Sequence, residues 1–376
     1  MPQKRLVWLR HETKPFEERT ALSPDGVRRL ISKGHQVVVE SSPARCFNDA
    51  DYRAAGAELV LPDSWSSAPF QAIILGLKEV EKNTFPMPHR HIYFGHAYKQ
   101  QEGAADLLNR FVLGDGRLFD FEFLTDHAGM RVCAFGIWSG FVGTGLALKE
   151  WALKKQGQCL NQEAPLRPYS DSENFIFDVK NELERVAEQP KILIIGARGR
   201  CGRGAQKFLE ALKLKATLYS SADTLNRNTL PEALEYDIVI NAVLLKGAIP
   251  PFLTPELLAR ERKLSVVVDI SCDPNGPHNP LPIYNKETSF QRPVHKLNFG
   301  SELSLIAIDH LPSLLPRESS SDFESQFFPH LLEFLSGEIE DSPWERSLER
   351  FYQTVLELGL SFRDRPIEFE TQPTIN

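Results

Sequence analysis

A glycine cluster between an apolar run and a helical pattern constrains the fold of this chain more than any other feature. The segment from Lys191 to Ala205 begins with the strand-like sequence Ile-Leu-Ile-Ile and continues with closely spaced glycines: Gly196, Gly199, Gly202 and Gly204. A helical pattern from Gln206 to Leu214 follows. This order supplies a tight turn, close backbone approach and a helix N-terminus whose N–H groups can bind phosphate. We therefore expect a βα unit that binds a dinucleotide pyrophosphate, with a glycine turn in some other βα unit as the alternative.

Length and composition limit the class of protein. At 376 residues the chain is too long for one ordinary core, so two domains are expected, and 42% hydrophobic with 25% charged residues is typical of a globular protein. The net charge of −7 argues against nucleic acid as a partner. No apolar run approaches membrane-spanning length, and no secretory signal or C-terminal peroxisomal tripeptide is present. Five cysteines without paired spacing indicate free thiols in a reducing compartment and no metal site. We expect a soluble cytoplasmic protein.

Strand and helix patterns alternate along most of the chain. Strands are expected at 6–9, 36–40, 72–77, 91–96 and 117–121, with a helix at 24–33 after Ser23, and then at 192–195, 216–219, 237–242 and 265–270. Such a series predicts doubly wound parallel sheets. We therefore predict an α/β fold with two Rossmann-like domains separated by a cleft: a catalytic domain of residues 1–136 plus roughly 318–376, and a dinucleotide-binding domain of residues 137–317.

Helical segments outside this series connect the parts. Residues 137–154 form a long pattern opened by Gly140, Gly143 and Gly145, which we expect to cross between the domains and to pack closely through these glycines. Residues 156–169 are polar and contain proline, as in a surface loop. The helical patterns at 322–336 and 344–358 are expected to pack back on the first domain.

Polar residues follow several of the expected strands. Lys78 comes directly after an apolar run and Gly76, where burial would lower its pKa and make it a general base. His96 ends another strand, and Arg19 and Arg131 are of the type that holds carboxylates bidentately. Taken singly, each of these is more ordinary as a surface arginine, a solvent-facing lysine or a structural histidine. Lysine and histidine at adjoining strand ends favour a catalytic pair.

Several segments together resemble a known family. The segment from Arg10 to Val27, with Gly34–Glu40 and Tyr52–Ala57, resembles the N-terminal module of alanine dehydrogenases and transhydrogenases. Within that superfamily, the chain resembles the fungal saccharopine dehydrogenases that form lysine with NAD. The segments that carry this resemblance are Gly76–Glu79, Gly95–Lys99, Arg131–Gly136, Ile194–Gly202, Pro277–Tyr284 and Ile308–Glu318. The resemblance spans nearly the whole chain and fades after about Ser320.

The resemblance implies an activity and a set of site residues. Saccharopine would be oxidised at its secondary amine and the imine hydrolysed, releasing lysine and 2-oxoglutarate. Lys78 would be the general base for the amine and His96 the acid–base group for imine hydrolysis, with Glu79 and Glu122 tuning the local field. The implied substrate-binding residues are Arg19, Lys78, Gln101, Arg131, Phe135, Ser271, Cys272 and Asp273. The implied cofactor-binding residues are Gly196, Gly199, Arg200, Gly202, Ser220, Thr224, Leu244, Ile270, Ile308, Asp309, His310 and Leu311.

The chain departs from the family pattern at the cofactor. Ser220 stands where an acidic residue is expected to bind the adenosine ribose, and Asp223 lies a few residues late. The nearby arginines that would suit a 2′-phosphate are Arg198, Arg203 and Arg227. The cofactor is thus expected to be NAD, with NADP left open.

Further departures keep alternatives for the function. Met130 replaces an arginine, and Ala242 and Leu244 replace a cysteine and a tyrosine, so Cys201 is expected to be a free thiol. One alternative is an opine synthase that couples 2-oxoglutarate with another amino acid, using NADPH. Another is a metabolite-binding protein without turnover. The expected partners are small molecules, and the family resemblance suggests a monomer.

Overall fold

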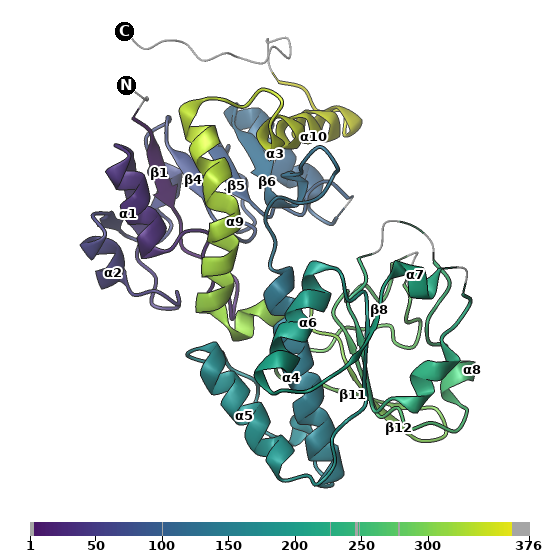
Figure 1. The fold of residues 1–376 in the computed structure, drawn as a ribbon. Helices are drawn as coiled ribbons and strands as arrows, with labels where there is room; N and C mark the ends of the chain where they lie inside the picture. Colours follow the sequence, from purple (N-terminus) through teal and green to yellow (C-terminus); the bar gives the residue numbers. More distant parts are fainter. Residues whose placement is uncertain are drawn as a thin grey trace. The chain divides into compact units, whose positions relative to one another are not determined.

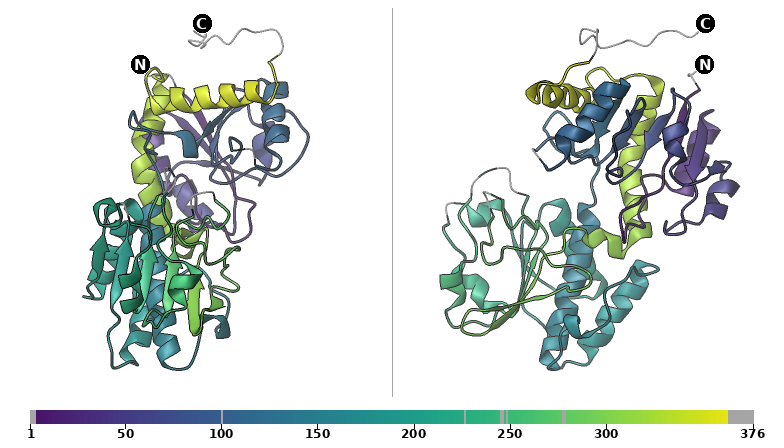
Figure 2. Two further views of the ribbon diagram at one scale, coloured as in Figure 1. Left: turned by 90° about the vertical axis from the view of Figure 1, so that its right-hand side faces the viewer. Right: turned by 180° about the vertical axis from the view of Figure 1, so that it is seen from behind.

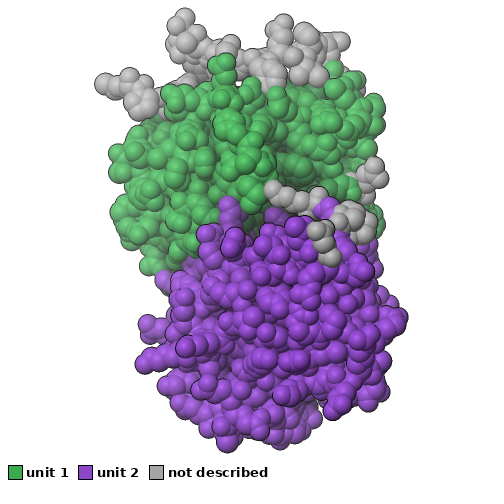
Figure 3. Space-filling view, turned by 45° about the vertical axis from the view of Figure 1, so that its right-hand side comes forward, with its two compact units in different colours: residues 1–134, 320–376 green, residues 135–319 purple. Residues whose placement is uncertain are grey.

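A computed structural model describes residues 4–99, 101–225, 227–244, 247, 249–276 and 279–362. The chain divides into two compact units, which Figure 3 shows in different colours: Met1–Ala134 with Ser320–Asn376, and Phe135–Ser319. Each unit contains a six-stranded sheet with helices packed around it. The predicted α/β class with two parallel-dominated sheets is therefore confirmed.

The sheet of the first unit is parallel throughout. Its strands follow the order β3-β2-β1-β4-β5-β6. They are β1 (Leu6–Leu9), β2 (Gln36–Glu40), β3 (Glu58–Val60), β4 (Ile73–Leu75), β5 (Arg90–Tyr93) and β6 (Arg117–Asp120). The central strands are nearly continuous apolar runs because helices cover both faces of a parallel sheet. The carboxyl ends of all six strands consequently meet at one edge of the sheet.

Helices of the first unit lie against this sheet (Figures 1 and 2), and aromatic side chains pack between them and the strands. The helices are α1 (Pro24–Ser32), α2 (Asp49–Ala54), α3 (Ala104–Gly114), α9 (Pro316–Ser336) and α10 (Pro343–Glu357), with short 3₁₀ turns η1 (Ser64–Ser67) and η2 (Phe121–Phe123). Phe334 of α9 packs 4.8 Å from Phe119 of β6, measured between ring centroids, and Phe111 of α3 packs 5.3 Å from His91 of β5. The prediction that the C-terminal helices return to the first domain is confirmed.

The second unit contains one antiparallel strand. Its order is β11-β12-β10-β9-β7-β8, and only β11 runs antiparallel to its neighbour among the described strands. The strands are β7 (Ile192–Ile195), β8 (Thr217–Tyr219), β9 (Ile238–Asn241), β10 (Val266–Asp269), β11 (His295–Asn298) and β12 (Glu302–Ile306). The hairpin of β11 and β12 was not among the predicted elements. Its turn contains Gly300 at φ +86°, and β11 alternates half-buried and exposed side chains, as expected of an edge strand.

Close packing of two helices dominates the interior of the second unit. Its helices are α4 (Gly136–Lys155), α5 (Ser172–Glu184), α6 (Arg200–Ala211), α7 (Ser221–Thr224) and α8 (Pro255–Leu258), with 3₁₀ turns η3 (Leu160–Gln162), η4 (Pro231–Glu235) and η5 (Leu311–Leu314). A Cβ on Gly140 of α4 would lie 1.8 Å from the carbonyl oxygen of Cys201. A Cβ on Gly204 of α6 would lie 1.8 Å from that of Ile137. The prediction of close packing through glycine is confirmed.

The same helix corrects another expectation. The units divide between Ala134 and Phe135, before α4 begins, so α4 lies within the second unit and does not cross between domains. Within the described ranges, no helix combines the length and apolarity needed to cross a bilayer.

Replacing Gly140 with alanine should destabilise the protein. The new methyl group would meet a backbone carbonyl that cannot rotate away, so we expect the free energy of unfolding in urea to fall by roughly 1–3 kcal/mol. Gly247→Ala is the matched control, because a Cβ there has no neighbour within 4 Å. Equal stabilities of the two variants would contradict the packing argument.

Candidate active site

Charged side chains gather where four strands of the first unit end. β1, β4, β5 and β6 are neighbours in the parallel sheet. The charged residues that follow these strands are Arg10, Glu12, Lys78, Glu79, His96, Lys99 and Glu122. Because the carboxyl ends of parallel strands form the usual ligand-binding edge of such sheets, this cluster is the candidate catalytic site of the unit.

Lys78 lies half-buried among other ionisable side chains. Its backbone N–H donates to Glu12 Oε2 at 2.8 Å, just after the end of β4. Its side-chain charge lowers the pKa of Glu17 and that of His96. The structure therefore brings the predicted Lys78 and His96 into one electrostatic cluster.

Arg19 is a buried residue rather than a surface arginine. Its Nε and Nη2 atoms donate to the two carboxylate oxygens of Glu17 at 2.7 and 2.6 Å, and the two side chains are each 3% exposed. Burial raises the pKa of Glu17, but the charge and hydrogen bonds of Arg19, together with the charge of Lys78, outweigh it and hold the pKa below its usual value. Glu17 is consequently a carboxylate near neutral pH.

His96 has a constrained backbone and a lowered basicity. Its φ of +48° is in the left-handed region, immediately after Gly95, whose N–H donates to Asp120. Burial and the charge of Lys78 lower the pKa of His96, against the opposing effect of Glu79, whose Oε1 lies 3.7 Å from Nε2. The imidazole is thus neutral near pH 7 and able to accept a proton.

Glu122 connects the remaining predicted residues of this unit. Its Oε1 atom accepts from Lys99 Nζ at 2.5 Å and from Arg131 Nη2. Burial raises the pKa of Glu122, but the hydrogen bond from Lys99 and the charge of Arg131 outweigh it and lower the pKa overall. Gln101 accepts from the backbone N–H of Lys99 at 2.7 Å. Arg131 and Gln101 therefore belong to the same cluster.

Three carboxyl groups of the cluster were not identified from the sequence: Glu12, Glu17 and Asp120. Asp120 accepts the backbone N–H groups of Gly95 at 3.1 Å and Glu122 at 2.8 Å, and burial raises its pKa to about 7. For Asp120, the sequence offered a signal: it is an acidic residue at the last position of a strand, where a side chain lies at the ligand-binding edge of the sheet.

The glycine loop of the second unit has the geometry of a phosphate cradle. Gly196 has φ +87°, and a Cβ there would lie 2.7 Å from the carbonyl oxygen of Ala242. A Cβ on Gly202 would lie 2.3 Å from the carbonyl oxygen of Gly196. The helix begins at Arg200 with Gly199 as its N-cap, earlier than the pattern from Gln206 predicted, because Gly202 and Gly204 are helical. The residues present therefore fit a dinucleotide pyrophosphate at the N-terminus of α6.

The residues that follow β8 form hydrogen bonds with one another. Asp223 Oδ2 accepts the backbone N–H of Ser220 at 2.7 Å and its hydroxyl at 2.8 Å, which completes a capping box at α7. Thr224 lies half-buried in α7, one residue beyond Asp223. Arg227 forms an ion pair with Glu232 at 2.6 Å. Of the arginines considered for a 2′-phosphate, only Arg198 and Arg203 are exposed.

Polar contacts hold the loop after β10. Asp269 accepts from Asn241 Nδ2 at 2.9 Å and from the Tyr284 hydroxyl at 2.8 Å, and Ser271 Oγ donates to the carbonyl of Val243 at 2.6 Å. Cys272, at φ +48°, is buried, and burial raises the pKa of its thiol. The positions of Ser271, Cys272 and Asp273 are therefore set from several elements of the second unit.

Other residues of the implied cofactor set differ in exposure. Ile308 and Leu311 are each 1% exposed in the core, and Ile270 packs against it, whereas Asp309 is exposed and Leu244 is 69% exposed. His310 packs on Phe290 at 4.5 Å between ring centroids. Phe135 is the N-cap of α4. Cys201 is a free thiol, as predicted, and burial raises its pKa to about 11. Pro277 and His278, in one resembling segment, lie outside the described residues.

The implied residues are thus divided between the units. The first unit contains Arg19, Lys78, His96, Gln101 and Arg131, and the second contains Phe135, Ser271–Asp273 and the implied cofactor-binding residues.

Asp120 should make stability depend on pH. Its pKa rises from an ordinary value of 3.8 to about 7 on folding, so between these values the native state holds a proton that the unfolded state has lost. Stability from this group is therefore greatest near pH 4 and falls as pH rises toward 7, by on the order of a few kcal/mol. We expect the free energy of unfolding of Asp120→Asn, relative to the unsubstituted protein, to increase from pH 4 to pH 7 in urea titrations. A difference independent of pH would refute this titration.

Comparison with known proteins agrees with these features. Residues 8–142 match the family model "Alanine dehydrogenase/PNT, N-terminal domain" and residues 180–354 match its C-terminal domain. The saccharopine dehydrogenase (NAD(+), L-lysine-forming) of Candida glabrata is 45% identical over 91% of this chain and 95% of that protein. Its counterpart in Candida albicans is 40% identical over 94% and 98%. A solved L-alanine dehydrogenase has the same fold at a TM-score of 0.66, with 18% identity over 94% of this chain and 99% of that chain. The chain therefore belongs to the fungal saccharopine dehydrogenase family, built from alanine dehydrogenase/PNT domains.

Proposed function

We propose that this protein is an oxidoreductase that interconverts saccharopine with L-lysine and 2-oxoglutarate, with NAD as its cofactor. The identity of 45% over nearly the full length of an enzyme named for this reaction carries the proposal. The clustering of Lys78 and His96 at adjoining strand ends supports it, because the reaction needs two groups that exchange protons.

The acid–base residues suit successive steps. NAD, held by the glycine loop, would supply the hydride acceptor for the carbon next to the secondary amine of saccharopine. Lys78 takes the proton of that amine as general base. His96, neutral near pH 7, then takes a proton from the water that attacks the imine, and Glu79 at 3.7 Å stabilises the imidazolium that results.

The remaining residues are assigned to binding the substrate and the cofactor. Arg131, whose side chain is 41% exposed and paired with Glu122, would hold a substrate carboxylate, and Arg19, which is paired with Glu17, would be a second carboxylate-binding residue. We assign substrate-binding roles to Gln101 in the first unit and to Phe135, Ser271, Cys272 and Asp273 in the second. The backbone at Gly196–Gly202 would bind the pyrophosphate of NAD and the segment at Ser220 its ribose. We place this activity in the cytoplasm, in a monomer whose partners are small molecules.

A spectrophotometric assay tests the function directly. Purified protein is mixed with 2-oxoglutarate, NADH or NADPH and single amino acids, and the loss of reduced-nicotinamide absorbance is followed. We expect consumption with lysine and NADH. Consumption only with another amino acid, or only with NADPH, would instead indicate an opine-forming enzyme. No consumption under any condition would favour a metabolite-binding protein.

Replacing Lys78 with methionine should remove the general base. We expect kcat to fall by roughly a hundredfold, while NADH binding, measured by fluorescence titration, stays unchanged because the glycine loop belongs to the second unit. Lys82→Met is the matched control, an exposed lysine in the same loop. Equal rates for the two variants would remove Lys78 from the mechanism.

Replacing Ser220 with aspartate should strengthen the preference for NAD over NADP. A carboxylate at this position would bind the ribose hydroxyls and repel a 2′-phosphate. The measurement is the ratio of kcat/KM for NADH to that for NADPH. Ser221→Asp adds the same charge at the exposed neighbouring position, and we expect it to change the ratio less. A larger effect at Ser221 would mean that another residue decides the preference.

A further inference from the structure

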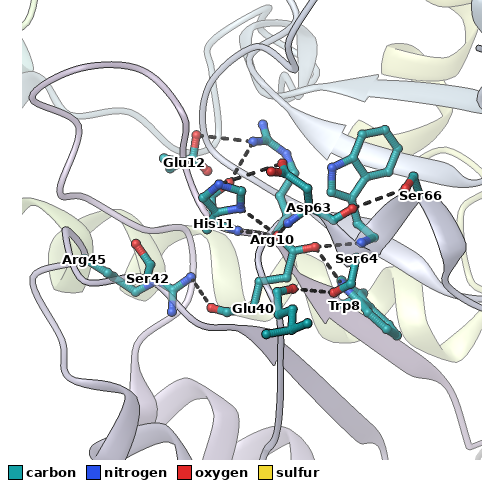
Figure 4. A network of polar contacts seen from close by, with 12 residues as sticks. Trp8, Arg10, His11, Glu12, Glu40, Ser42, Arg45, Asp63, Ser64 and Ser66 are labelled. Atoms are coloured by element: carbon teal, nitrogen blue, oxygen red, sulfur yellow. Dashed lines mark hydrogen bonds and ion pairs between the residues drawn. The ribbon is translucent and has the colours of Figure 1, made fainter.

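A buried ion pair holds both backbone polar groups of Lys78. Glu12 accepts the N–H of Leu77 at 2.7 Å through Oε1 and the N–H of Lys78 at 2.8 Å through Oε2. Arg10 donates from Nη2 to the carbonyl oxygen of Lys78, and its Nη1 lies 3.5 Å from Glu12 Oε2. The side chains of Arg10 and Glu12 are 2% and 7% exposed. Figure 4 shows this ion pair among the surrounding polar contacts.

The ion pair acts where the sheet no longer orders the chain. β4 ends at Leu75, and two residues later the carbonyl of Leu77 still accepts from the N–H of Phe94 at 3.1 Å. A Cβ on Gly76 would lie 2.3 Å from Arg10 Nε, so the arginine also occupies the space that a side chain would need. At the next residue, Lys78, Glu12 holds the backbone N–H and Arg10 the carbonyl.

Burying an ion pair of this kind costs free energy of folding. Burial raises the pKa of Glu12 above its usual value, although the charge of Arg10 and the two amide hydrogen bonds oppose this shift. Buried ion pairs often add little net stability, because the loss of hydration offsets the attraction of the charges. Their value is then in fixing a conformation.

We propose that Glu12, together with Arg10, is a positioning residue that fixes the backbone of Lys78 and thereby aims its side-chain nitrogen within the cluster of Glu17 and His96. This inference rests on the proposed function, in which Lys78 is the general base. Glu12 touches neither reacting group through its own side chain; it acts through the two peptide N–H groups that it holds.

Glu40 provides a matched control on the neighbouring strand. Its side chain is fully buried, and it accepts from Trp8 Nε1 at 3.2 Å, from His11 Nδ1 at 2.8 Å and from the backbone N–H of Trp65 at 2.7 Å. Figure 4 shows these contacts around the end of β2. Glu40 thus resembles Glu12 in residue type, burial and use of backbone donors, but it holds Trp8, His11, Asp63 and Trp65 rather than Lys78.

The first test compares Glu12→Gln with Glu40→Gln. A glutamine has one acceptor oxygen, so Glu12→Gln leaves one of the two peptide N–H groups opposite an amide nitrogen. We expect kcat to fall by about tenfold to a hundredfold, with KM for saccharopine changed by less than about twofold. Glu40→Gln should lower Tm at least as much while kcat stays within about twofold. A similar loss of kcat in both variants would reduce Glu12 to a general structural role and overturn the proposal.

The second test observes Lys78 without turnover. Lysines are reductively methylated with ¹³C, and the Lys78 resonance is assigned by its absence in Lys78→Arg. We expect this resonance to move in Glu12→Gln and to stay in place in Glu40→Gln. An unmoved resonance in Glu12→Gln would overturn the proposal. A moved resonance in a protein that does not oxidise saccharopine would support the positioning role and refute the proposed function.

Arg10→Lys covers the case in which Glu12→Gln does not fold. A lysine keeps the positive charge beside Glu12 but lacks the second donor that reaches the Lys78 carbonyl. We expect the same changes in kcat and in the Lys78 resonance, in a smaller amount. An unchanged resonance together with an unchanged kcat would overturn the role of the ion pair.

Discussion

The parallel pairing of β1, β4, β5 and β6 is the constraint on which the candidate site of the first unit depends. Parallel strands bring their carboxyl ends to one edge of the sheet. The residues that follow these strands therefore meet there, even though they are far apart in the sequence. Glu12 and Lys78 illustrate this, since their hydrogen bond joins residues 66 positions apart. The apolar strands thus set the positions of the charged groups, although most of those groups lie in the segments that follow the strands.

The charges at this edge differ in protonation because their partners differ. Glu17 and Glu122 are both desolvated, yet cationic neighbours hold their pKa values low. Asp120 lies close by and accepts two peptide N–H groups, but burial outweighs these hydrogen bonds and the charge of Arg131, and its pKa rises to about 7. The pKa of His96, in contrast, is lowered by burial and by the charge of Lys78. One cluster therefore holds both carboxylates and a neutral base near pH 7, which acid–base catalysis of two successive proton transfers requires.

Much of the fold could be predicted from the sequence, and the failures have physical causes. Strands such as β1 and β7 were placed exactly as the structure has them, because a strand buried on both faces is an uninterrupted apolar run. The start of α6 was placed too late, since glycine disfavours helices unless close packing, as at Gly204, requires it. The β11–β12 hairpin was missed because β11, with the sequence His-Lys-Leu-Asn, contains one apolar residue and buries no side chain fully, so it lacks the apolar run of the central strands. At the candidate site, the position of Lys78 and His96 at adjoining strand ends could be predicted, whereas the contacts of Glu12 with two backbone amides could not, because such contacts leave no pattern in the sequence.

The departure at Ser220 has a structural rationale that does not depend on the cofactor. Ser220 caps α7, and Asp223 completes the capping box, so the local structure uses a serine and an acid three residues apart. The carboxylate of Asp223 is thereby turned toward the backbone N–H and hydroxyl of Ser220. Arg227 is likewise committed to Glu232. The acid and one of the bases of this segment are thus engaged internally, whereas Arg198 and Arg203 are exposed and the charge of Arg198 acts on Asp223, so the capping box explains why Asp223 lies three residues after Ser220 without reference to a ligand.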